Sequence, residues 1–539
     1  MNTFVTIFFG LLLVLTTRSV AYSQNDIDAL LSRMLDAYGG EEQLEDIQSL
    51  EFETVGYFHG RNQSRRTEPP WDRIPVRQFT AIEFPSERAA RDVLSAWPGG
   101  LSMGRREISN GENSWTLNTI SRFYEASDAS GYRYALNSVN TRFPGLFVRF
   151  LDDNRDRISD IDTEMRDGIH YISFLYGERT IVLVHPETFL ISTMEYDGID
   201  HMSGRTVSYQ REYQDYYLYE GMMVPGRFLM WVDGLPYFDL NISHLAFNVN
   251  IEAYLEIPDT FVEIESSAGY SGQSEIDVRR IADGVYAAGD GEIQILYVEF
   301  DDYWVAMETG NFPSYAEATH QMMMPHMNGK PLRYIVPTHY HDDHLIGIHY
   351  YARIGATILT TRDKEAYIRQ MLDRSHGDHG PVQNASFEYI EGDLFQIADE
   401  TNRMDIHVYA DAPHTENMLV AYVHGSEILF SGDTVIGWVQ PDRGHVRQGA
   451  PFAAVHMDNW VREQQAAGRM GSIREYVNVH GLAYSPEEWR QMLSTERTFV
   501  TLPDNAALPV LSWFLDYGLS DETVHNPRRD YLPTIPTTH

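Results

Sequence analysis

The spacing of apolar residues changes along the chain, and these changes predict where helices and strands lie. From residue 25 to 38, apolar residues recur every three to four positions, which predicts a helix that Gly39-Gly40 ends. From about residue 47 to 258, short apolar and β-branched runs alternate with turn signals, as in an antiparallel sheet. The clearest runs are 50–58, 171–175, 180–184, 207–213 and 226–232. We therefore expect a mainly antiparallel β domain here, built on a curved sheet or half-barrel.

The pattern changes again in the second half of the chain, where strand-like and helix-like segments alternate. Strands are expected at 293–300, 303–307, 356–360 and 418–423, and helices near 345–353 and 362–373. This alternation is typical of an α/β domain. A Gly/Ser-rich stretch marks the boundary between the two halves. The predicted organisation is a mainly-β domain (24–262), a linker (263–275), an α/β domain (276–502) and an extended, proline-containing tail (503–539).

The first 23 residues have the features of a targeting segment. A mostly apolar run at 4–15 is followed by Ala21-Tyr22-Ser23, a small-x-small cleavage pattern. The run is too short to cross a bilayer. We expect a cleaved signal peptide at 1–23 and a periplasmic or secreted protein. An uncleaved anchor is the alternative.

Composition narrows the partners. The 539 residues carry a formal net charge of −37 and only two lysines, Lys330 and Lys364. Such a surface repels nucleic acid, because phosphate binding needs Lys/Arg contacts. The chain has no cysteine, which excludes a thiolate metal ligand and a lipid-modified N-terminal cysteine. We expect a small-molecule substrate, no nucleic acid and no membrane span after signal removal; a homo-oligomer stays open.

The strongest chemical signal is the run Thr338-His339-Tyr340-His341-Asp342-Asp343-His344, directly after an apolar strand-like segment. On an extended segment His339 and His341 point to the same side, while Asp343 and His344 follow where a helix begins. Neutral imidazole and carboxylate are ligands of zinc and similar divalent ions. Further His and Asp residues follow at the ends of later strand-like segments. The candidate ligands are, in order, His339, His341, Asp343, His344, His414, Asp433 and His480.

With these motifs, roughly residues 275 to 500 resemble the metallo-β-lactamase superfamily of metal-dependent hydrolases. The resemblance implies two sheets sandwiched between helices, an αββα sandwich, with the metals at one edge. It also implies two divalent ions, for which zinc is expected. One ion would be held by His339, His341 and His414. The second would be held by Asp343, His344 and His480, and Asp433 would bridge both.

The chain departs from the family pattern at one early motif. An Asp-Thr-Gly at a strand end is replaced by Glu308-Thr309-Gly310. The longer carboxylate can still orient a metal ligand from outside the ligand set.

The expected chemistry is hydrolysis. Two metals about 3.5–4 Å apart share a water, lower its pKa and deliver it as a bridging hydroxide. Asp343 and Asp433 are the expected catalytic residues, and Asp343 would also accept a proton. The bond cleaved would belong to an ester, lactone, thioester, amide or sulfate ester. The alternatives are a β-lactamase, or an apolar-ligand-binding protein with a structural metal site.

Two further hypotheses concern substrate and ligand. Trp438, Arg443 and His445 follow Asp433 on a long loop and are candidates for substrate contact. The N-terminal half loosely resembles outer-membrane lipoprotein carrier and sorting proteins, through Tyr38-Gly39-Gly40 and the segment 221–225. In that family a curved sheet cups an apolar ligand. A structural or dimerisation role for this half is an equally open interpretation.

Overall fold

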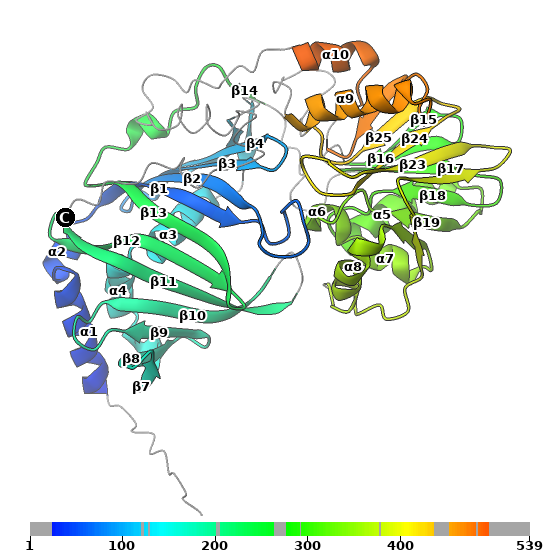
Figure 1. The fold of residues 1–539 in the computed structure, drawn as a ribbon. Coiled ribbons are helices and arrows are strands. Elements are labelled where there is room, and N and C mark those ends of the chain that lie inside the picture. Colours follow the sequence, from blue (N-terminus) through cyan, green and yellow to red (C-terminus); the bar gives the residue numbers. More distant parts are fainter. Residues whose placement is uncertain are drawn as a thin grey trace, which may run out of the picture.

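The computed structural model describes residues 24–119, 123–127, 130–200, 205–263, 276–290, 293–376, 379–435, 452–480 and 483–494. The expected signal peptide (1–23), most of the expected linker (264–275) and the expected tail (503–539) lie outside these residues. Figure 1 shows a large curved sheet in the N-terminal part and a layered α/β domain in the C-terminal part.

The N-terminal part contains one sheet, which has fourteen strands among the described residues. Its order is β14-β6-β5-β4-β3-β2-β1-β13-β12-β11-β10-β9-β8-β7. Neighbouring strands are antiparallel, except that β14 runs parallel to β6. The predicted antiparallel β domain is confirmed. The strands are β1 (Ser49–His59), β2 (Arg73–Glu83), β3 (Arg88–Trp97), β4 (Leu101–Asn110), β5 (Ser114–Asn118), β6 (Phe123–Ser127), β7 (Ile158–Arg166), β8 (Ile169–Tyr176), β9 (Thr180–Val184), β10 (Ile191–Ile199), β11 (Thr206–Tyr219), β12 (Met222–Val232), β13 (Leu235–Phe247) and β14 (Val262–Glu263).

Helices pack on this sheet, and the sequence pattern predicted only the first of the longer ones. The helix expected at 25–38 is α1 (Gln24–Tyr38). The reading of 47–258 as strands missed α3 (Ser130–Arg142) and α4 (Pro144–Asp153). Proline at the first helical position and buried Phe147, Val148 and Leu151 were the available helical signals for α4. The shorter helical segments are α2 (Glu41–Glu45), η1 (Arg155–Arg157) and η2 (Glu252–Tyr254).

The N-terminal core lies between these helices and the sheet. Helix α3 contacts β2, β3 and β4, while α1 and α4 contact β12. At the centre, the ring of Phe52 on β1 meets the ring of Phe143, which lies between α3 and α4, edge to face at 4.9 Å. Both side chains are at most 1% exposed. The helices therefore occupy the apolar face of the sheet on which Phe52 lies.

The C-terminal part contains two sheets and has the predicted αββα arrangement. One sheet has the order β15-β16-β17-β18-β19-β20-β21, and the other has the order β22-β23-β24-β25-β26. Figure 1 shows α5, α7 and α8 outside the first sheet, and α9 and α10 outside the second. The strands are β15 (Asp277–Ala282), β16 (Val285–Gly289), β17 (Gln294–Glu299), β18 (Trp304–Met307), β19 (Leu332–Val336), β20 (Thr357–Thr360), β21 (Phe387–Tyr389), β22 (Leu394–Ala398), β23 (Arg403–Tyr409), β24 (Met418–Val423), β25 (Ile428–Ser431) and β26 (Glu475–Asn478). The helical segments are α5 (Pro313–Met323), η4 (Met324–His326), α6 (Asp342–Leu345), α7 (Ile348–Arg353), η5 (Arg362–Lys364), α8 (Glu365–Leu372), α9 (Phe452–Ala466) and α10 (Pro486–Ser494).

Strand β24 shows why this domain forms layers. Its side chains alternate between two faces, as the period of a strand requires. Leu419 and Ala421 belong to the core between the two sheets. Val420 and Tyr422 belong to the core under α9 and α10. Because β24 is buried on both faces, its sequence is a continuous apolar run. This run predicted the strand with its correct bounds.

Candidate metal centre

The predicted ligands follow strands whose carboxyl ends meet at one edge of the sandwich. His339 follows β19, which is parallel to β18, and Asp433 follows β25, which is parallel to β26. His480 comes two residues after β26 ends. Asp343 and His344 lie in the single turn of α6, which begins directly after His341. Because parallel strands end at the same edge, these loops converge.

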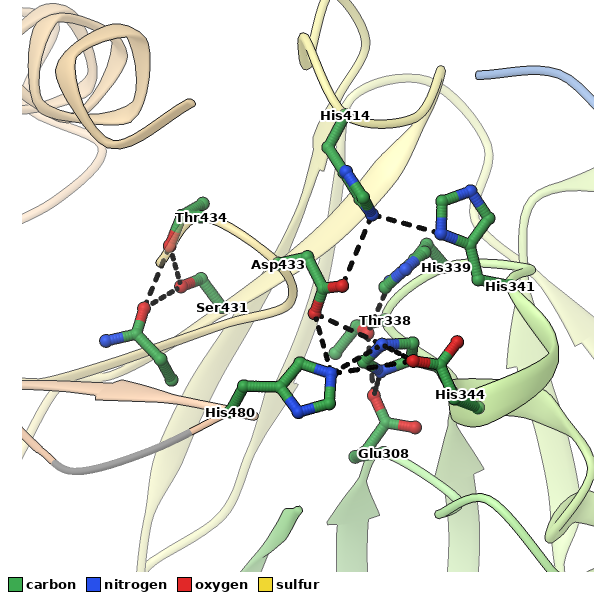
Figure 2. A network of polar contacts seen from close by, with 12 residues as sticks. Glu308, Thr338, His339, His341, His344, His414, Ser431, Asp433, Thr434 and His480 are labelled. Atoms are coloured by element: carbon green, nitrogen blue, oxygen red, sulfur yellow. Dashed lines mark hydrogen bonds and ion pairs between the residues drawn. The ribbon is translucent and has the colours of Figure 1, made fainter. Parts of the chain in front are cut away.

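All seven predicted ligands lie in this centre, in two groups that share one carboxylate. The ligand atoms of each group lie within 4.8 Å of one another. One group is His339, His341, His414 and Asp433, and the other is Asp343, His344, Asp433 and His480. Figure 2 shows Asp433 between them.

The short distances between ligand atoms connect both groups to Asp433. Its Oδ2 lies 3.3 Å from His414 Nε2, and its Oδ1 lies 3.1 Å from His344 Nε2 and 3.4 Å from His480 Nε2. His414 Nε2 also lies 3.0 Å from His341 Nδ1. Asp343 Oδ2 lies 3.4 Å from His344 Nε2 and 3.6 Å from His480 Nε2. Such a convergence of nitrogen and oxygen donors matches the coordination preference of divalent cations.

The other ring nitrogens are held by hydrogen bonds, which decide which atoms remain for a metal. His344 Nδ1 donates to Glu308 Oε2 at 3.1 Å. Thr338 Oγ1 donates to the same oxygen at 2.7 Å, so it accepts from His339 Nδ1, which lies 3.0 Å away. Among the described residues, His339 Nε2 is buried without a hydrogen-bond partner, and Asp433 Oδ1 is buried facing the Nε2 atoms of His344 and His480. A metal would satisfy these two atoms, so the residues present fit a divalent ion.

The replaced motif, Glu308-Thr309-Gly310, supports this arrangement. Glu308 is fully buried and has a φ of +88°, a conformation unfavourable for a residue with a side chain. Its Oε1 accepts the backbone N–H of Thr309 at 2.7 Å, while its Oε2 faces Thr338 and His344. The longer carboxylate therefore orients one histidine of each group, directly for His344 and through Thr338 for His339.

Residues 288–479 match the family model described as "Metallo-beta-lactamase superfamily". The C-terminal domain is a metallo-β-lactamase superfamily domain. Membership of this superfamily supports a hydrolase.

Solved structures similar to the chain include two metallo-β-lactamases and a sulfatase. The metallo-β-lactamase from Pontibacter korlensis is 19% identical, with 41% of this chain and 98% of that chain covered and a TM-score of 0.29. The one from Hirschia baltica is 18% identical, with 41% and 96% covered and a TM-score of 0.29. The sec-alkylsulfatase Pisa1 from Pseudomonas sp. is 13% identical, with 40% of each chain covered and a TM-score of 0.30. No curated protein sequence matched the chain.

In the metallo-β-lactamase domain, electrostatics favour an ionised Asp433 and neutral imidazoles in the group that contains His339, His341 and His414. Burial raises the pKa of Asp433, but the adjacent His344 and His480 outweigh it and hold this pKa well below its ordinary value. Burial lowers the pKa of His339 well below its ordinary value, and burial with His414 lowers that of His341 to about 3. A neutral imidazole is the form that binds a metal.

In the group that contains Asp343, His344 and His480, neighbouring carboxylates outweigh burial at His344 and favour a protonated imidazole. Burial lowers the pKa of His344, but Asp433, Asp343 and Glu308 outweigh it and raise this pKa well above its ordinary value. Asp343 and Asp433, which lie against Nε2 of both His344 and His480, thus attract positive charge to the position between these two histidines. A divalent cation there would displace the proton, so that metal binding would release protons.

Several residues of the centre carried no signal in the sequence. Asn478 accepts hydrogen bonds from Ser431 at 2.9 Å and from Thr434 at 2.8 Å, which ties together the loops of Asp433 and His480. At Gly432, a Cβ would lie 2.9 Å from Thr338 Oγ1 and 3.0 Å from His339 Nδ1, so only glycine allows this approach. The acceptors for the second nitrogens of His341 and His414 come from the N-terminal part. Trp438, Arg443 and His445, the candidates for substrate contact, lie outside the described residues.

Proposed function

We propose that this chain is an exported, dinuclear metal-dependent hydrolase that cleaves an ester, lactone, thioester, amide or sulfate ester. The observation that carries the proposal is the shared carboxylate. Two groups of four donors meet at Asp433, and each group supplies nitrogen and oxygen atoms within 4.8 Å of one another. A structural metal site needs only one such group closed by protein ligands.

The reaction class follows from what this donor set binds. When bound, two divalent ions lower the pKa of a water and polarise the bond to be cleaved. Asp433 belongs to both groups of ligands and so fixes their positions relative to each other. Asp343, with a side chain 32% exposed, is open to solvent and in place to accept a proton from the attacking water. The buried histidines stay fixed because their outer nitrogens are hydrogen-bonded.

The donor set favours zinc, since imidazole and carboxylate without thiolate suit it, although related ions share this preference. Export is supported by the sequence of residues 1–23, which lie outside the described residues. Among the residues that the structure describes, no helix is both long enough and apolar enough for a membrane span. The strong negative charge supports a small-molecule substrate over a nucleic acid.

The deciding experiment combines metal content with turnover. Full-length protein purified without chelator should hold about two metal equivalents and hydrolyse at least one member of a panel of esters, lactones, thioesters, β-lactams and sulfate esters. Asp433→Asn should lose metal, and turnover should fall by more than about 100-fold, because losing a ligand exceeds the ~10–100-fold effect of losing a partner of a ligand.

Asp405→Asn is the matched control. Asp405 is 1% exposed and paired with Arg403 and His424 in the same domain, away from the ligands. It should keep both metal equivalents and turnover. A wild-type protein that holds no metal, even after zinc or manganese is added, would contradict the proposal.

A further inference from the structure

Two loops of the N-terminal sheet reach the metal centre of the other domain. Figure 1 shows the β1–β2 loop, in blue, extending to α6. From this loop, Gln63 Nε2 donates to Asp343 Oδ1 at 2.8 Å, and Ser64 O accepts from His341 Nε2 at 2.8 Å. From the β3–β4 turn, Pro98 O accepts from His414 Nδ1 at 2.8 Å.

The β1–β2 loop is held firmly where it meets the centre. Asp72 Oδ2 accepts from Ser64 Oγ at 2.7 Å and from the backbone N–H of Arg65 at 2.7 Å. On the other side, the single hydroxyl hydrogen of Tyr340 is shared between Ser64 O and Arg66 O, the latter at 2.6 Å from the hydroxyl oxygen. The loop is therefore bonded within itself, through Asp72 at its end next to β2, and to the residue between His339 and His341.

The β3–β4 turn is equally constrained. Gly99 has a φ of +88° and accepts the backbone N–H of Ala453 at 2.8 Å. A Cβ at this position would lie 3.1 Å from Ala453 Cβ and 3.4 Å from His414 Cβ. The turn thus packs against the ligand itself, and the adjacent Pro98 carbonyl accepts a hydrogen bond from His414 Nδ1.

These contacts select the atoms that face a metal. A carbonyl can only accept, so His341 carries its proton on Nε2 and His414 carries its proton on Nδ1. That leaves His341 Nδ1 and His414 Nε2, the two atoms found 3.0 Å apart in the centre. Gln63 similarly occupies Oδ1 of Asp343 and leaves Oδ2, the oxygen nearest His344 and His480.

We propose that the N-terminal domain contributes to the metal centre by positioning its ligands. It orients ligands of both groups, through Gln63 for the group with Asp343 and through the Pro98–Gly99 turn for the group with His414. This inference rests on the proposed function. Its consequence is that metal affinity depends on how the two domains dock, and that bound metal in turn strengthens the docking.

The test measures the affinity of each metal group in the full-length chain. Metal-free protein is titrated with zinc in competition with a chromophoric chelator. His414→Ala and His480→Ala identify which of the two affinities belongs to which group.

Gln63→Ala should weaken the group with Asp343 by about 10–100-fold, the usual effect of losing a partner of a ligand, and should leave the other group within about twofold. Gly99→Ala should weaken the group with His414 selectively, because the strain at a φ of +88° and the close approach of the added Cβ to Ala453 at 3.1 Å should shift the turn whose Pro98 carbonyl holds His414.

Matched controls separate positioning from folding. Gln48 is exposed and donates its side-chain amide to Glu45 O, so Gln48→Ala removes a glutamine amide far from the centre. Gly168 has a φ of +83° and no atom within 4 Å of an added Cβ, so Gly168→Ala adds the same kind of backbone strain without a contact. Both controls should retain both affinities.

Each outcome is decisive. Selective weakening of the named group supports the inference. Unchanged affinities, or equal weakening of both groups matched by the controls, overturn it while the proposed function stands. A wild-type chain that binds no zinc overturns the proposed function, and this inference with it.

Discussion

Replacing Glu308 by glutamine tests how the buried carboxylate controls both metal groups. The two oxygens of Glu308 face different donors. Oε1 faces the backbone N–H groups of Thr309 at 2.7 Å and Gly310 at 3.4 Å, and Oε2 faces Thr338 Oγ1 and His344 Nδ1. Glutamine has nearly the same shape but supplies only one acceptor oxygen, so its NH₂ group must face one of these pairs.

The backbone amides cannot reverse their polarity, whereas a hydroxyl and an imidazole can. The NH₂ group of the introduced glutamine should therefore turn toward Thr338 and His344. His344 must then accept at Nδ1 and carry its proton on Nε2, the atom that faces the metal. Thr338 must accept as well, which turns its hydroxyl toward His339 and favours a proton on His339 Nε2.

The expected loss follows from these tautomers. To bind a metal through Nε2, His344 must again carry its proton on Nδ1. This N–H group then faces the NH₂ group of the introduced glutamine, and two buried donors that oppose each other cost about 1–3 kcal/mol. Since about 1.4 kcal/mol is tenfold, zinc affinity should fall by about 10–100-fold at both groups.

Chelator competition on the metal-free protein measures both affinities, and urea unfolding of the same samples checks folding. Glu299→Gln is the control, because Glu299 is a carboxylate of the same domain that does not contact the ligands. Its side chain is 19% exposed and accepts a hydrogen bond from Lys330 Nζ at 2.7 Å. A folded E308Q protein whose two zinc affinities stay within twofold of wild type would refute this reasoning.

Two further predictions concern stability. His407 is 2% exposed, and burial lowers its pKa to about 4, against about 6.5 when unfolded. The unfolded chain therefore binds the proton first, and stability falls as pH drops from about 6.5 toward 4. His407→Phe should reduce the loss in unfolding free energy between pH 7 and pH 5 by about 2 kcal/mol, measured by urea unfolding; parallel pH curves would contradict this. Trp304 is fully buried, so Trp304→Ala should lower the free energy of unfolding by about 3–5 kcal/mol in the same assay. Met324→Ala, at a 57% exposed position, is the control and should change this free energy by less than about 0.5 kcal/mol. Equal effects of the two substitutions would show that Trp304 does not stabilise the core.

Much of the fold could be predicted where the apolar pattern is local and regular. The apolar runs 180–184 and 418–423 predicted the bounds of β9 and β24. The alternation of strands and helices predicted an α/β domain, whereas its two-sheet layering followed from the resemblance to the metallo-β-lactamase superfamily. Helices α3 and α4 were missed because their apolar positions lie among strand-like segments. Their helical state is supported by packing on the sheet, as in the contact of Phe143 with Phe52.

For the centre, the sequence by itself determined the set of donors. Imidazole and carboxylate side chains at strand ends have a local and chemically specific signature, so His339 to His344, His414, Asp433 and His480 could be named in advance. The signal peptide, the substrate and the metal identity stay predictions.

Only the tertiary structure decided what holds those donors. Ser64 and Pro98 act through backbone carbonyls, which every residue has, and so leave no mark in a sequence. Gln63 lies 280 positions from Asp343, and only the docking of two domains brings the pair together. Glu308 could be recognised as a replacement, but its reach to His344 and Thr338 depends on a φ of +88° that the surrounding packing imposes. Ligand identity is a property of side-chain chemistry, whereas ligand orientation is a property of distant surfaces meeting in space.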